Sequence, residues 1–376
     1  MQLEFTSEQE DLRDSVRVVL ERECPMTLVR AVVETGVAPD ALWKHMVELG
    51  WTALTVPGSA GGLGLGPVEL AVVVEELGRV VAPGPFLATA TQFTSAVREA
   101  GDDTQQQRFL GPIVEGTATG ALAITEPGVA ADPIAVRAQA ARSNGTWTLL
   151  GSKTFVLDGD TADEIVVVAR EPGTVGEDGV VALVTPRDAL NVTPRQPLDP
   201  TRSLVDLDLD GAQVPDDRRL GDPGPHTVLA LRRAIEEATA MLAVEIVGTS
   251  QAILDVTLDY AKQREQFGVP IGSFQAIKHK FADMLIALER ARATAYFAAL
   301  CVAEDDPRRA IAVATAKAAA GDCQRRFGKE GIQILGGIGY TWEHDMHLYV
   351  RRIKTDAQLL GTAHEHRRRI AELLGL

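Results

Sequence analysis

The stretch GIQILGGIGYTWEHDMHLYVRRIKTDAQLLGT, residues 331–362, carries more information about the fold than any other part of this chain of 376 residues. It places a glycine-rich turn, GGIG at 336–339, after a helical pattern, and it ends on Gly361-Thr362. Glycines let a backbone approach a phosphate closely because they carry no Cβ, although a simple turn between two helices needs the same residues. A last helix is expected from about residue 363.

Composition and charge exclude several classes of protein. The chain has a formal net charge of −15, a pI of about 5.0 and 45% hydrophobic residues. An acidic chain is not expected to bind nucleic acid or an anionic membrane surface. Its three cysteines show no zinc or disulfide spacing, the N-terminus has no signal-peptide pattern, and no uninterrupted apolar run reaches the roughly 18 residues of a membrane span. A cytoplasmic location is the expectation.

The chain divides into three zones of different periodicity. Residues 1–118 show helical spacing, and Thr6 is placed to cap the first helix. Residues 119–225 contain short β-rich segments, separated by Gly, Asp and Pro at intervals of about ten, with a hairpin turn at SNGT (143–146). Residues 226–376 are helical again. The pattern predicts an α+β protein with an N-terminal helical domain, a middle antiparallel β domain and a C-terminal helical bundle.

Motifs spread over essentially the whole chain resemble those of the acyl-CoA dehydrogenase family. They are, in order, VPGSAGGLGLG, ITEPG at 124–128, REQFG…FQ at 264–275, and QILGGIGYTWEHD. The resemblance implies an acyl-CoA dehydrogenase fold with a C-terminal four-helix bundle, FAD as cofactor, and an acyl-CoA thioester as substrate. It also implies transfer of a β-hydride to flavin N5 while a base removes the α-proton, a reaction that depends on positioning.

The resemblance assigns a first group of FAD contacts to the β domain. Ile124 and Thr125 end a strand where backbone groups and a hydroxyl can meet the flavin edge, although a strand terminus alone explains them. Phe155 matches the aromatic residue that lies over the isoalloxazine, or is an ordinary core residue. Ala131 stands where the family often has Ser, and Leu157 stands where the family commonly has Thr or Ser beside the flavin. Leucine cannot make the side-chain hydrogen bond that the family makes at position 157.

A second group of FAD contacts is expected from the helical bundle, usually across a subunit boundary. Its members are Arg264, Phe267, Gln275, Gln333, Gly336, Gly337 and Thr362. An Arg suits a diphosphate because its fork donates two hydrogen bonds, but the same residue at a helix end can simply stabilise the helix dipole. The glutamines can equally be surface residues, and Thr362 a plain N-cap. The minimum unit is then a dimer, and a tetramer of identical or homologous chains is usual.

The catalytic base of the family is missing. Leu360 occupies the position before Gly361-Thr362 where a glutamate often stands, and Ala238 occupies the alternative position on the long helix. Thr239 follows, where an Arg often meets the acyl-CoA. None of these side chains takes a proton from carbon or pairs with phosphate as a cation.

Two nearby carboxylates are candidates for the base. Glu237 is one residue from the alternative position, which rotates it by about 100° on a helix, and Glu245 lies about 10 Å further along roughly the same face. The simpler interpretations are that Glu237 faces water and that Glu245 forms an ion pair between helices. Asp356 is expected to pair with Arg352 on the surface.

A polar cluster at TWEHDMHLY (341–349) has the composition but not the ligand spacing of a metal site, so we expect no metal.

Two functions remain open at this point. The first is an acyl-CoA dehydrogenase of fatty acid or steroid side-chain β-oxidation, with an electron-transfer flavoprotein as acceptor. The second is a degenerate FAD-binding partner subunit of a heteromeric acyl-CoA dehydrogenase. A flavin monooxygenase-like relative is a weaker third option.

Overall fold

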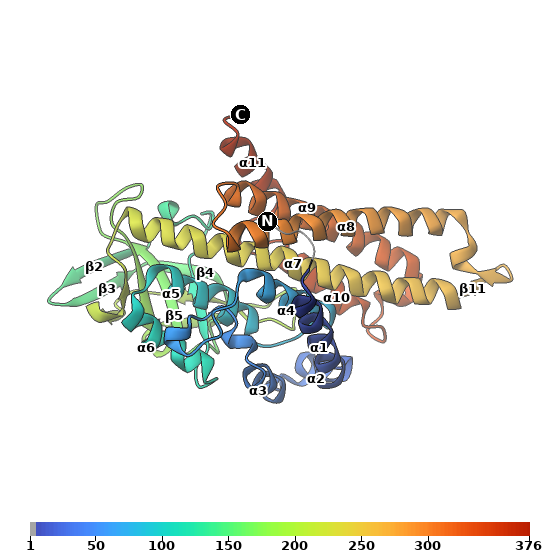
Figure 1. Ribbon diagram of the computed structural model, residues 1–376, viewed down its shortest axis with the longest axis horizontal. Helices are drawn as coiled ribbons and strands as arrows, with labels where there is room; N and C mark the ends of the chain where they lie inside the picture. Colours follow the sequence, from blue (N-terminus) through green and yellow to red (C-terminus); the bar gives the residue numbers. More distant parts are fainter. Residues whose placement is uncertain (1–4) are drawn as a thin grey trace.

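The computed structural model describes residues 5–376, in which the strands of the β region follow an N-terminal set of helices and precede a C-terminal set along the chain (Figure 1). The N-terminal helices are α1 (Ser7–Glu23), α2 (Met26–Thr35), α3 (Asp40–Glu48), α4 (Pro67–Arg79), the π-helix η3 (Leu87–Phe93), α5 (Thr94–Ala100) and α6 (Asp103–Val114), with short 3-10 turns η1 (Trp51–Ala53) and η2 (Gly58–Ala60). Thr6 caps α1 in a capping box with Gln9, as predicted.

Helix η3 brings the N-terminal region against the β region. All seven of its residues are buried, and it packs on β1 (Gly120–Ala123). A Cβ at Gly120 would lie 2.1 Å from the ring of Phe93, so only glycine allows this approach. Thr89 also exchanges two hydrogen bonds with the backbone of Gly120.

The middle region holds two sheets. Its remaining strands are β2 (Gln139–Ser143), β3 (Thr146–Leu150), β4 (Ser152–Leu157), β5 (Glu164–Arg170), β6 (Val180–Pro186), β7 (Asn191–Pro194), β8 (Leu204–Asp208), β9 (Gln213–Pro215) and β10 (Arg219–Leu220). One sheet has the order β10-β6-β5-β2-β3-β9 with β1 on β5, and the other has the order β4-β8-β7. The predicted hairpin at 143–146 is confirmed, with Asn144 and Gly145 at φ of 50° and 77°.

The expectation of an antiparallel middle domain is wrong for two strand pairs, because β5 pairs in parallel with both β1 and β2. β1 runs parallel to β5, with Gly120 opposite Glu164. A parallel neighbour needs a long connection, and here the chain passes through the whole β2–β4 segment before it returns as β5. Short-range alternation in the sequence predicts strands but not their relative direction.

The C-terminal region is built on long helices. They are α7 (Pro225–Gln263), α8 (Gln275–Ala303), α9 (Arg309–Leu335), α10 (Met346–Asp356) and α11 (Ala363–Leu373), with the small hairpin β11 (Glu265–Gln266) and β12 (Val269–Pro270) and the turn η8 (Gly336–Tyr340). Helix α7 is long and apolar enough to cross a membrane, yet 78% of its apolar window is buried inside the fold, as in a core helix. The sequence pattern predicts no helix between the turn at 336–339 and residue 363, and α10 is an additional element there.

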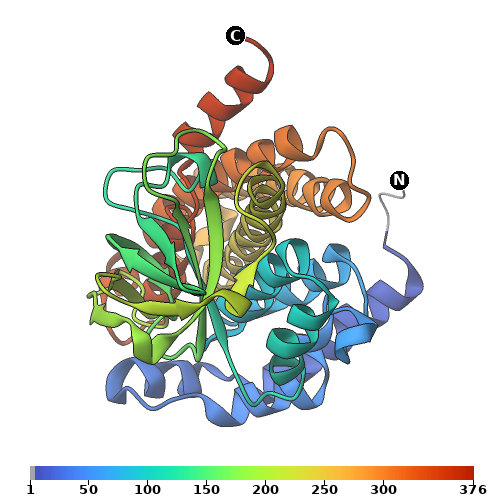
Figure 2. The ribbon, with the colours of Figure 1, turned by 90° about the vertical axis from the view of Figure 1, so that its left-hand side faces the viewer.

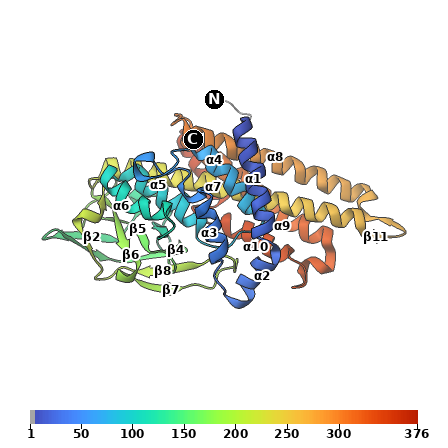
Figure 3. The same ribbon diagram turned by 60° about the horizontal axis from the view of Figure 1, so that its bottom comes forward.

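The arrangement of these parts places the β region at one end of the molecule. Figures 1 and 3 show the strands at one end and the β11–β12 hairpin at the other, joined by α7 along the length. Figure 2 shows the N-terminal helices below the strands and the ends of the long helices. The site described next lies where the β region meets α7, α9, α10 and α11.

Candidate active site

A cavity of about 1020 Å³ lies between the β region and the C-terminal helices. Its wall is formed by η3, β1 and the loop 124–133 that follows β1, by β4, by the turn at 195–198, by α7 and α9, and by the segment from the end of α10 into α11. Cavities of this size hold large organic ligands.

Phe155 stands out of β4 into this cavity. The pairing of β4 with β8 shifts register between Lys153 and Val156, and Phe155 takes a φ of 54° at this irregularity. Its side chain is 48% exposed, and the guanidinium of Arg195 lies 4.3 Å from the ring centroid. The irregular strand therefore presents a flat aromatic ring to whatever fills the cavity.

A buried ion pair fixes the loop after β1. Lys153 Nζ lies 2.6 Å from Glu126 Oε1, and both residues are almost fully buried. The carboxylate of Glu126 also accepts hydrogen bonds from the backbone of Arg137 and Ala138 at 2.7 and 3.0 Å. Burial lowers the pKa of Lys153 to about 8, against the opposing effect of Glu126. These contacts hold the loop that carries Ile124-Thr125 against β4.

The segment between α10 and α11 carries Leu360 at a φ of 53°. Lys317 Nζ donates to the carbonyl oxygens of Asp356, Leu359 and Gly361 at 2.7, 2.7 and 3.2 Å. His366 Nε2 lies 3.0 Å from the carbonyl oxygen of Leu360, which accepts its hydrogen. Two side chains from neighbouring helices thus clamp this turn, and Leu360 presents hydrocarbon to the cavity.

Three family models match this chain almost from end to end. They describe the N-terminal, middle and C-terminal domains of acyl-CoA dehydrogenase and match residues 6–117, 121–209 and 229–375. This chain belongs to the acyl-CoA dehydrogenase family. Its relatives by that name are oxidoreductases, and the family is FAD-dependent.

Individual relatives match this acyl-CoA dehydrogenase over nearly their whole lengths. Acyl-CoA dehydrogenase IpdE2 of Mycobacterium tuberculosis is 33% identical over 365 residues, 96% of each chain. The solved structure of butyryl-CoA dehydrogenase from Megasphaera elsdenii is 27% identical with a TM-score of 0.92 and covers 100% of both chains. A chain of the ChsE4-ChsE5 complex from Mycobacterium tuberculosis is 28% identical with a TM-score of 0.90, covering 100% of this chain and 99% of that one.

The first predicted group of cofactor contacts comes together in this acyl-CoA dehydrogenase. Ile124, Thr125, Ala131, Phe155 and Leu157 all line the cavity. Thr362, by contrast, is occupied as the N-cap of α11, in a capping box with Glu365, while its neighbours Leu360 and Gly361 reach the wall.

The second predicted group does not reach the same cavity. It comprises Arg264, Phe267, Gln275, Gln333, Gly336 and Gly337, none of which contributes to the cavity wall. These residues belong to the end of α7, the β11–β12 hairpin, the start of α8, the end of α9 and η8, at the opposite end of the molecule from the middle β region (Figure 1). The side chain of Phe267 is 94% exposed.

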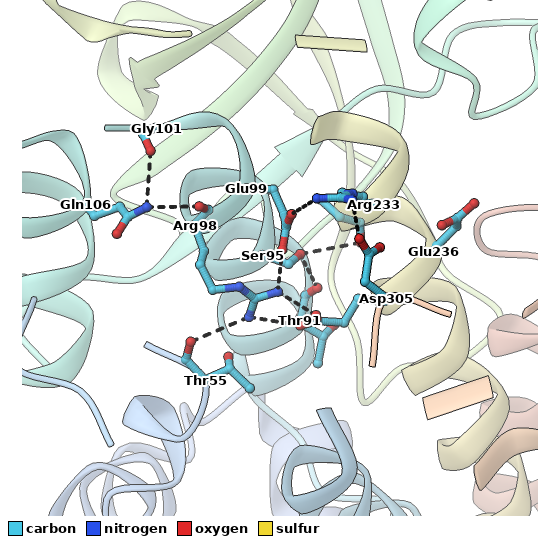
Figure 4. A network of polar contacts seen from close by, with 12 residues as sticks. Thr55, Thr91, Ser95, Arg98, Glu99, Gly101, Gln106, Arg233, Glu236 and Asp305 are labelled. Carbon is cyan, nitrogen blue, oxygen red and sulfur yellow. Dashed lines mark hydrogen bonds and ion pairs between the residues drawn. The ribbon is translucent and has the colours of Figure 1, made fainter. Parts of the chain in front are cut away.

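Glu237 is not part of the cavity wall but pairs with Arg98, whose network with Glu99 between α5 and α7 is shown in Figure 4. Its carboxylate pairs with Arg98, with Oε2 2.5 Å from Nη2, and the residue is 1% exposed. The expectation that Glu237 faces water is therefore wrong, because packing of α5 on α7 buries that face of the helix.

Glu245 lies in a second buried network, also outside the cavity wall. Arg352 Nη1 donates to Glu245 Oε1 at 2.8 Å, Arg202 binds the other oxygen, and Arg352 also pairs with Asp199 at 2.6 Å. The predicted ion pair of Glu245 between helices is confirmed. The predicted surface pairing of Asp356 with Arg352 is wrong, because Asp356 is fully buried and pairs with Arg202 at 3.1 Å.

Carboxylates that do reach the cavity wall have partners of their own. Glu236 pairs with Arg309, and Glu365 accepts from the backbone N–H and hydroxyl of Thr362 at 2.7 and 2.8 Å. The backbone hydrogen bond from Thr362 lowers the pKa of Glu365. Each is held by a cation or by helix-capping donors.

Sequence reasoning missed several residues of the cavity wall. They include Gln92 in η3, Arg195 in the turn after β7, Lys354 in α10, and Arg368 and Arg369 in α11. No motif marks them, because they are spread over four separate segments that only the fold brings together.

The residues of the wall fit FAD by their chemistry. An isoalloxazine needs a flat apolar surface with backbone donors at its edge, which Phe155, Leu157 and the end of β1 offer. A diphosphate needs donors in a fork or point cations, and Arg195, Lys354 and Arg368 lie on the same wall.

Proposed function

We propose that this chain takes part in the FAD-dependent α,β-dehydrogenation of an acyl-CoA thioester. The observation that carries the proposal is the cavity of about 1020 Å³, in which the exposed ring of Phe155 and the turn of Leu360 contribute to one wall. FAD, when bound, supplies the acceptor for the hydride from the β-carbon.

In this proposal the chain's own residues bind and orient. Phe155, Leu157 and Ile124 provide the apolar surface against which the flat ring and the acyl chain are held, so that water is excluded from the reacting carbons. The positive side chain of Arg232 on the cavity wall suits a phosphate of a CoA thioester.

The acceptor for the α-proton is the open part of the proposal. Glu237 and Glu245 are the two candidate bases from the sequence. Before either carboxylate can reach a substrate, Glu237 has to break its ion pair with Arg98, and Glu245 has to break its ion pairs with Arg202 and Arg352. We therefore propose a second candidate function: an FAD-binding partner subunit of a heteromeric acyl-CoA dehydrogenase, whose homologous chain contributes the base. Leu360 favours this candidate, and so does the match to a chain of the two-component ChsE4-ChsE5 complex.

The remaining partners follow from the same reasoning. The residues Arg264, Phe267, Gln275, Gln333, Gly336 and Gly337 lie far from the chain's own cavity, so we propose that they complete the cofactor site of a second copy or a homologous chain. Similarity to a chain in a solved structure of the electron transferring flavoprotein of Acidaminococcus fermentans, at 27% identity and a TM-score of 0.91, supports such a flavoprotein as electron acceptor. We propose a cytoplasmic location and a role in the β-oxidation of fatty acids or of bulkier acyl groups.

Anaerobic flavin spectroscopy tests the proposal. The purified chain is loaded with FAD and titrated with acyl-CoAs of increasing length, first alone and then with the homologous chains of its organism. Loss of the oxidised flavin band by the chain alone supports a complete enzyme. Full loading with loss of the band only after a second chain is added supports the partner subunit. A protein that stays colourless in both settings contradicts the proposal.

The candidate bases are tested in the same assay. Glu237→Gln and Glu245→Gln each remove one proton acceptor while they keep the side-chain shape. Loss of flavin reduction in one variant only, with its flavin content and fold intact, identifies that residue as the base. Full rates in both variants exclude both residues.

A further inference from the structure

The polar side chains of η3 and the first turn of α5 are buried, and all but one are satisfied. Thr89, Thr91, Thr94 and Ser95 each donate a hydroxyl to a backbone carbonyl at 2.6–3.2 Å. The amide of Gln92 has no hydrogen-bond partner among residues 5–376. Gln92 is 5% exposed and lines the cavity. Because Gln92 lines the cavity, its amide is open to a ligand or to a water that occupies the cavity.

The surroundings of Gln92 on the cavity wall are mostly apolar. Leu122, Ile235 and Leu360 line the cavity and belong to, or pack against, the apolar cluster that contains Phe93, the neighbour of Gln92. Thr239, also on the wall, already donates its hydroxyl to the carbonyl of Ile235 at 2.6 Å. A ligand group that enters this part of the cavity therefore meets hydrocarbon and one free amide.

The charges behind η3 argue against an anionic ligand group. Helix α5, which continues η3, carries Arg98 and Glu99 into the network of Figure 4. In that network three guanidiniums, those of Arg98, Arg233 and Arg309, face four carboxylates, those of Glu99, Glu236, Glu237 and Asp305. The balance is one negative charge, and every arginine in it already pairs with a carboxylate. A carboxylate on the acyl group of the ligand would therefore find no unpaired arginine in this network.

We propose that Gln92 determines substrate specificity by binding an uncharged oxygen, a ketone or a hydroxyl, on the acyl group, so that the preferred acyl-CoA is oxygenated rather than a plain hydrocarbon. The amide donates to a ketone and both donates to and accepts from a hydroxyl. A site built to bond an oxygen discriminates against the analogue that lacks it, because that analogue displaces water from the amide without replacing its hydrogen bond. This inference depends on the proposed function, since it presumes that acyl-CoA occupies the cavity.

Binding calorimetry with matched thioesters tests the inference without any need for turnover. The FAD-loaded protein, together with any chain that copurifies with it, is titrated with octanoyl-CoA, with its 5-, 6- and 7-oxo derivatives, and with suberyl-CoA, which ends in a carboxylate. A twelve-carbon series repeats the comparison. We expect at least one oxo derivative to bind about fivefold to tenfold more tightly than the saturated thioester, and the carboxylate to bind no more tightly than it.

Two variants locate the effect. Gln92→Leu removes the amide at nearly constant volume and should abolish the preference for the oxo derivative. Thr91→Val changes a neighbouring residue of η3 whose hydroxyl bonds to the backbone and which does not line the cavity, so the preference should persist. Thermal unfolding of each variant shows whether it is folded. If Gln92→Leu fails to fold, Gln92→Met replaces it, and the preference of the wild type for the oxo derivative is compared with that of Gln92→Met.

The outcomes separate this inference from the function on which it depends. Equal affinity for saturated and oxo thioesters in the wild type overturns the role of Gln92 and leaves acyl-CoA binding intact. A preference that survives Gln92→Leu overturns it as well, since another group then binds the oxygen. Failure of every thioester to bind, with FAD in place, contradicts the proposed function itself and the inference with it.

Discussion

Leu360 adopts a backbone conformation that a leucine rarely takes. Its φ is 53°, and this left-handed region costs an L-residue roughly 1–2 kcal/mol. The clamp by Lys317 and His366 holds the turn in this shape, so its geometry is kept although the side chain is hydrocarbon. The backbone at this position is therefore fixed by its neighbours, independently of the side chain that it carries.

We expect Leu360→Glu to add a base to the cavity. A carboxylate in contact with the reacting carbons typically contributes about 10²–10⁴-fold in rate, so the variant should reduce its flavin with acyl-CoA at least tenfold faster than the wild type. Leu360→Gln is the matched control, because it has the same shape and takes up no proton. Equal rates in both variants, with equal flavin content, would show that the cavity lacks more than a base.

Asp158 is a buried carboxyl with an unpaired oxygen, Oδ2. Burial raises its pKa to about 7 from an ordinary value of 3.8. Between these values the folded state holds a proton that the unfolded state lacks, so the associated stability is fully present below pH 3.8 and is lost as the pH rises through 7.

Asp158→Asn should therefore stabilise the protein at alkaline pH. We expect an increase of at least about 1 kcal/mol in the free energy of unfolding at pH 8, because each pKa unit corresponds to about 1.4 kcal/mol, and no increase near pH 4. Urea unfolding at the two pH values measures both. An equal gain at both values would assign the effect to packing rather than to ionisation.

At the scale of elements, the network around Glu245 joins α7, α10 and the turn at 199–202. Its members Arg202, Arg352, Asp199, Glu245 and Asp356 are all buried and partnered across these three segments. Removing one partner of such a network leaves a buried charge uncompensated. Glu245 therefore stabilises the contact between these three segments, whether or not it also acts as a base.

We expect Glu245→Gln to lower the free energy of unfolding by about 3–5 kcal/mol, as for other buried ion pairs that lose one member. Asp217→Asn provides the control, because Asp217 is 66% exposed in its pair with Arg108 and should cost less than about 1 kcal/mol. Urea unfolding of both variants gives the comparison. A small loss in Glu245→Gln would mean that the network relaxes around the change.

The junction of α10 and α11 contains a group that titrates in acid. Burial, together with the charge of Lys317, lowers the pKa of His366 to about 4 from 6.5. Between these values the unfolded state binds the proton and the folded state does not. The corresponding stability is present above pH 6.5 and is lost as the pH falls through 4.

His366→Gln keeps a donor for the carbonyl of Leu360 and removes the titration. The variant should lose about 1–3 kcal/mol less stability than the wild type between pH 6.5 and pH 4. His364→Gln, an exposed residue of the same helix, should follow the wild type. Acid unfolding followed by circular dichroism measures all three, and parallel curves for wild type and His366→Gln would contradict the assignment.

At the scale of the whole molecule, the predicted cofactor residues separate into two sets at opposite ends. The cavity set lies beside the strands, and the set of the β11–β12 hairpin and the end of α9 lies beyond the far end of α7 (Figure 1). A rigid helix of 39 residues, at about 1.5 Å per residue, keeps them apart within one chain.

Phe267→Asp tests whether the hairpin serves a second chain. Because Phe267 is 94% exposed, the change should leave the stability of the isolated chain within about 0.5 kcal/mol, yet reduce both association and FAD retention. Val175→Asp is the control, because Val175 is 75% exposed in a loop of the β region. Sedimentation and flavin content of the purified variants provide the measurement, and unchanged values in Phe267→Asp would contradict the second-chain role.

The sequence by itself determined the family, the helix–strand–helix order, the hairpin at 143–146 and the cap at Thr362, because each depends on local periodicity, turn chemistry or a contiguous motif. The motifs also predicted that five residues contribute to one site, and all of them line the cavity: Ile124, Thr125, Ala131, Phe155 and Leu157. The sequence alone also shows that position 360 carries a leucine and not a carboxylate.

Only the tertiary structure decided which polar groups are paired. Glu237 and Glu245 look available in the sequence, but their arginine partners lie 139 and 107 residues away along the chain. The same holds for the parallel pairing of β1 with β5, for α10, and for the place of Gln92 on the cavity wall. Partners that are distant in sequence are chosen by packing, and packing is a property of the whole fold rather than of any short stretch of it.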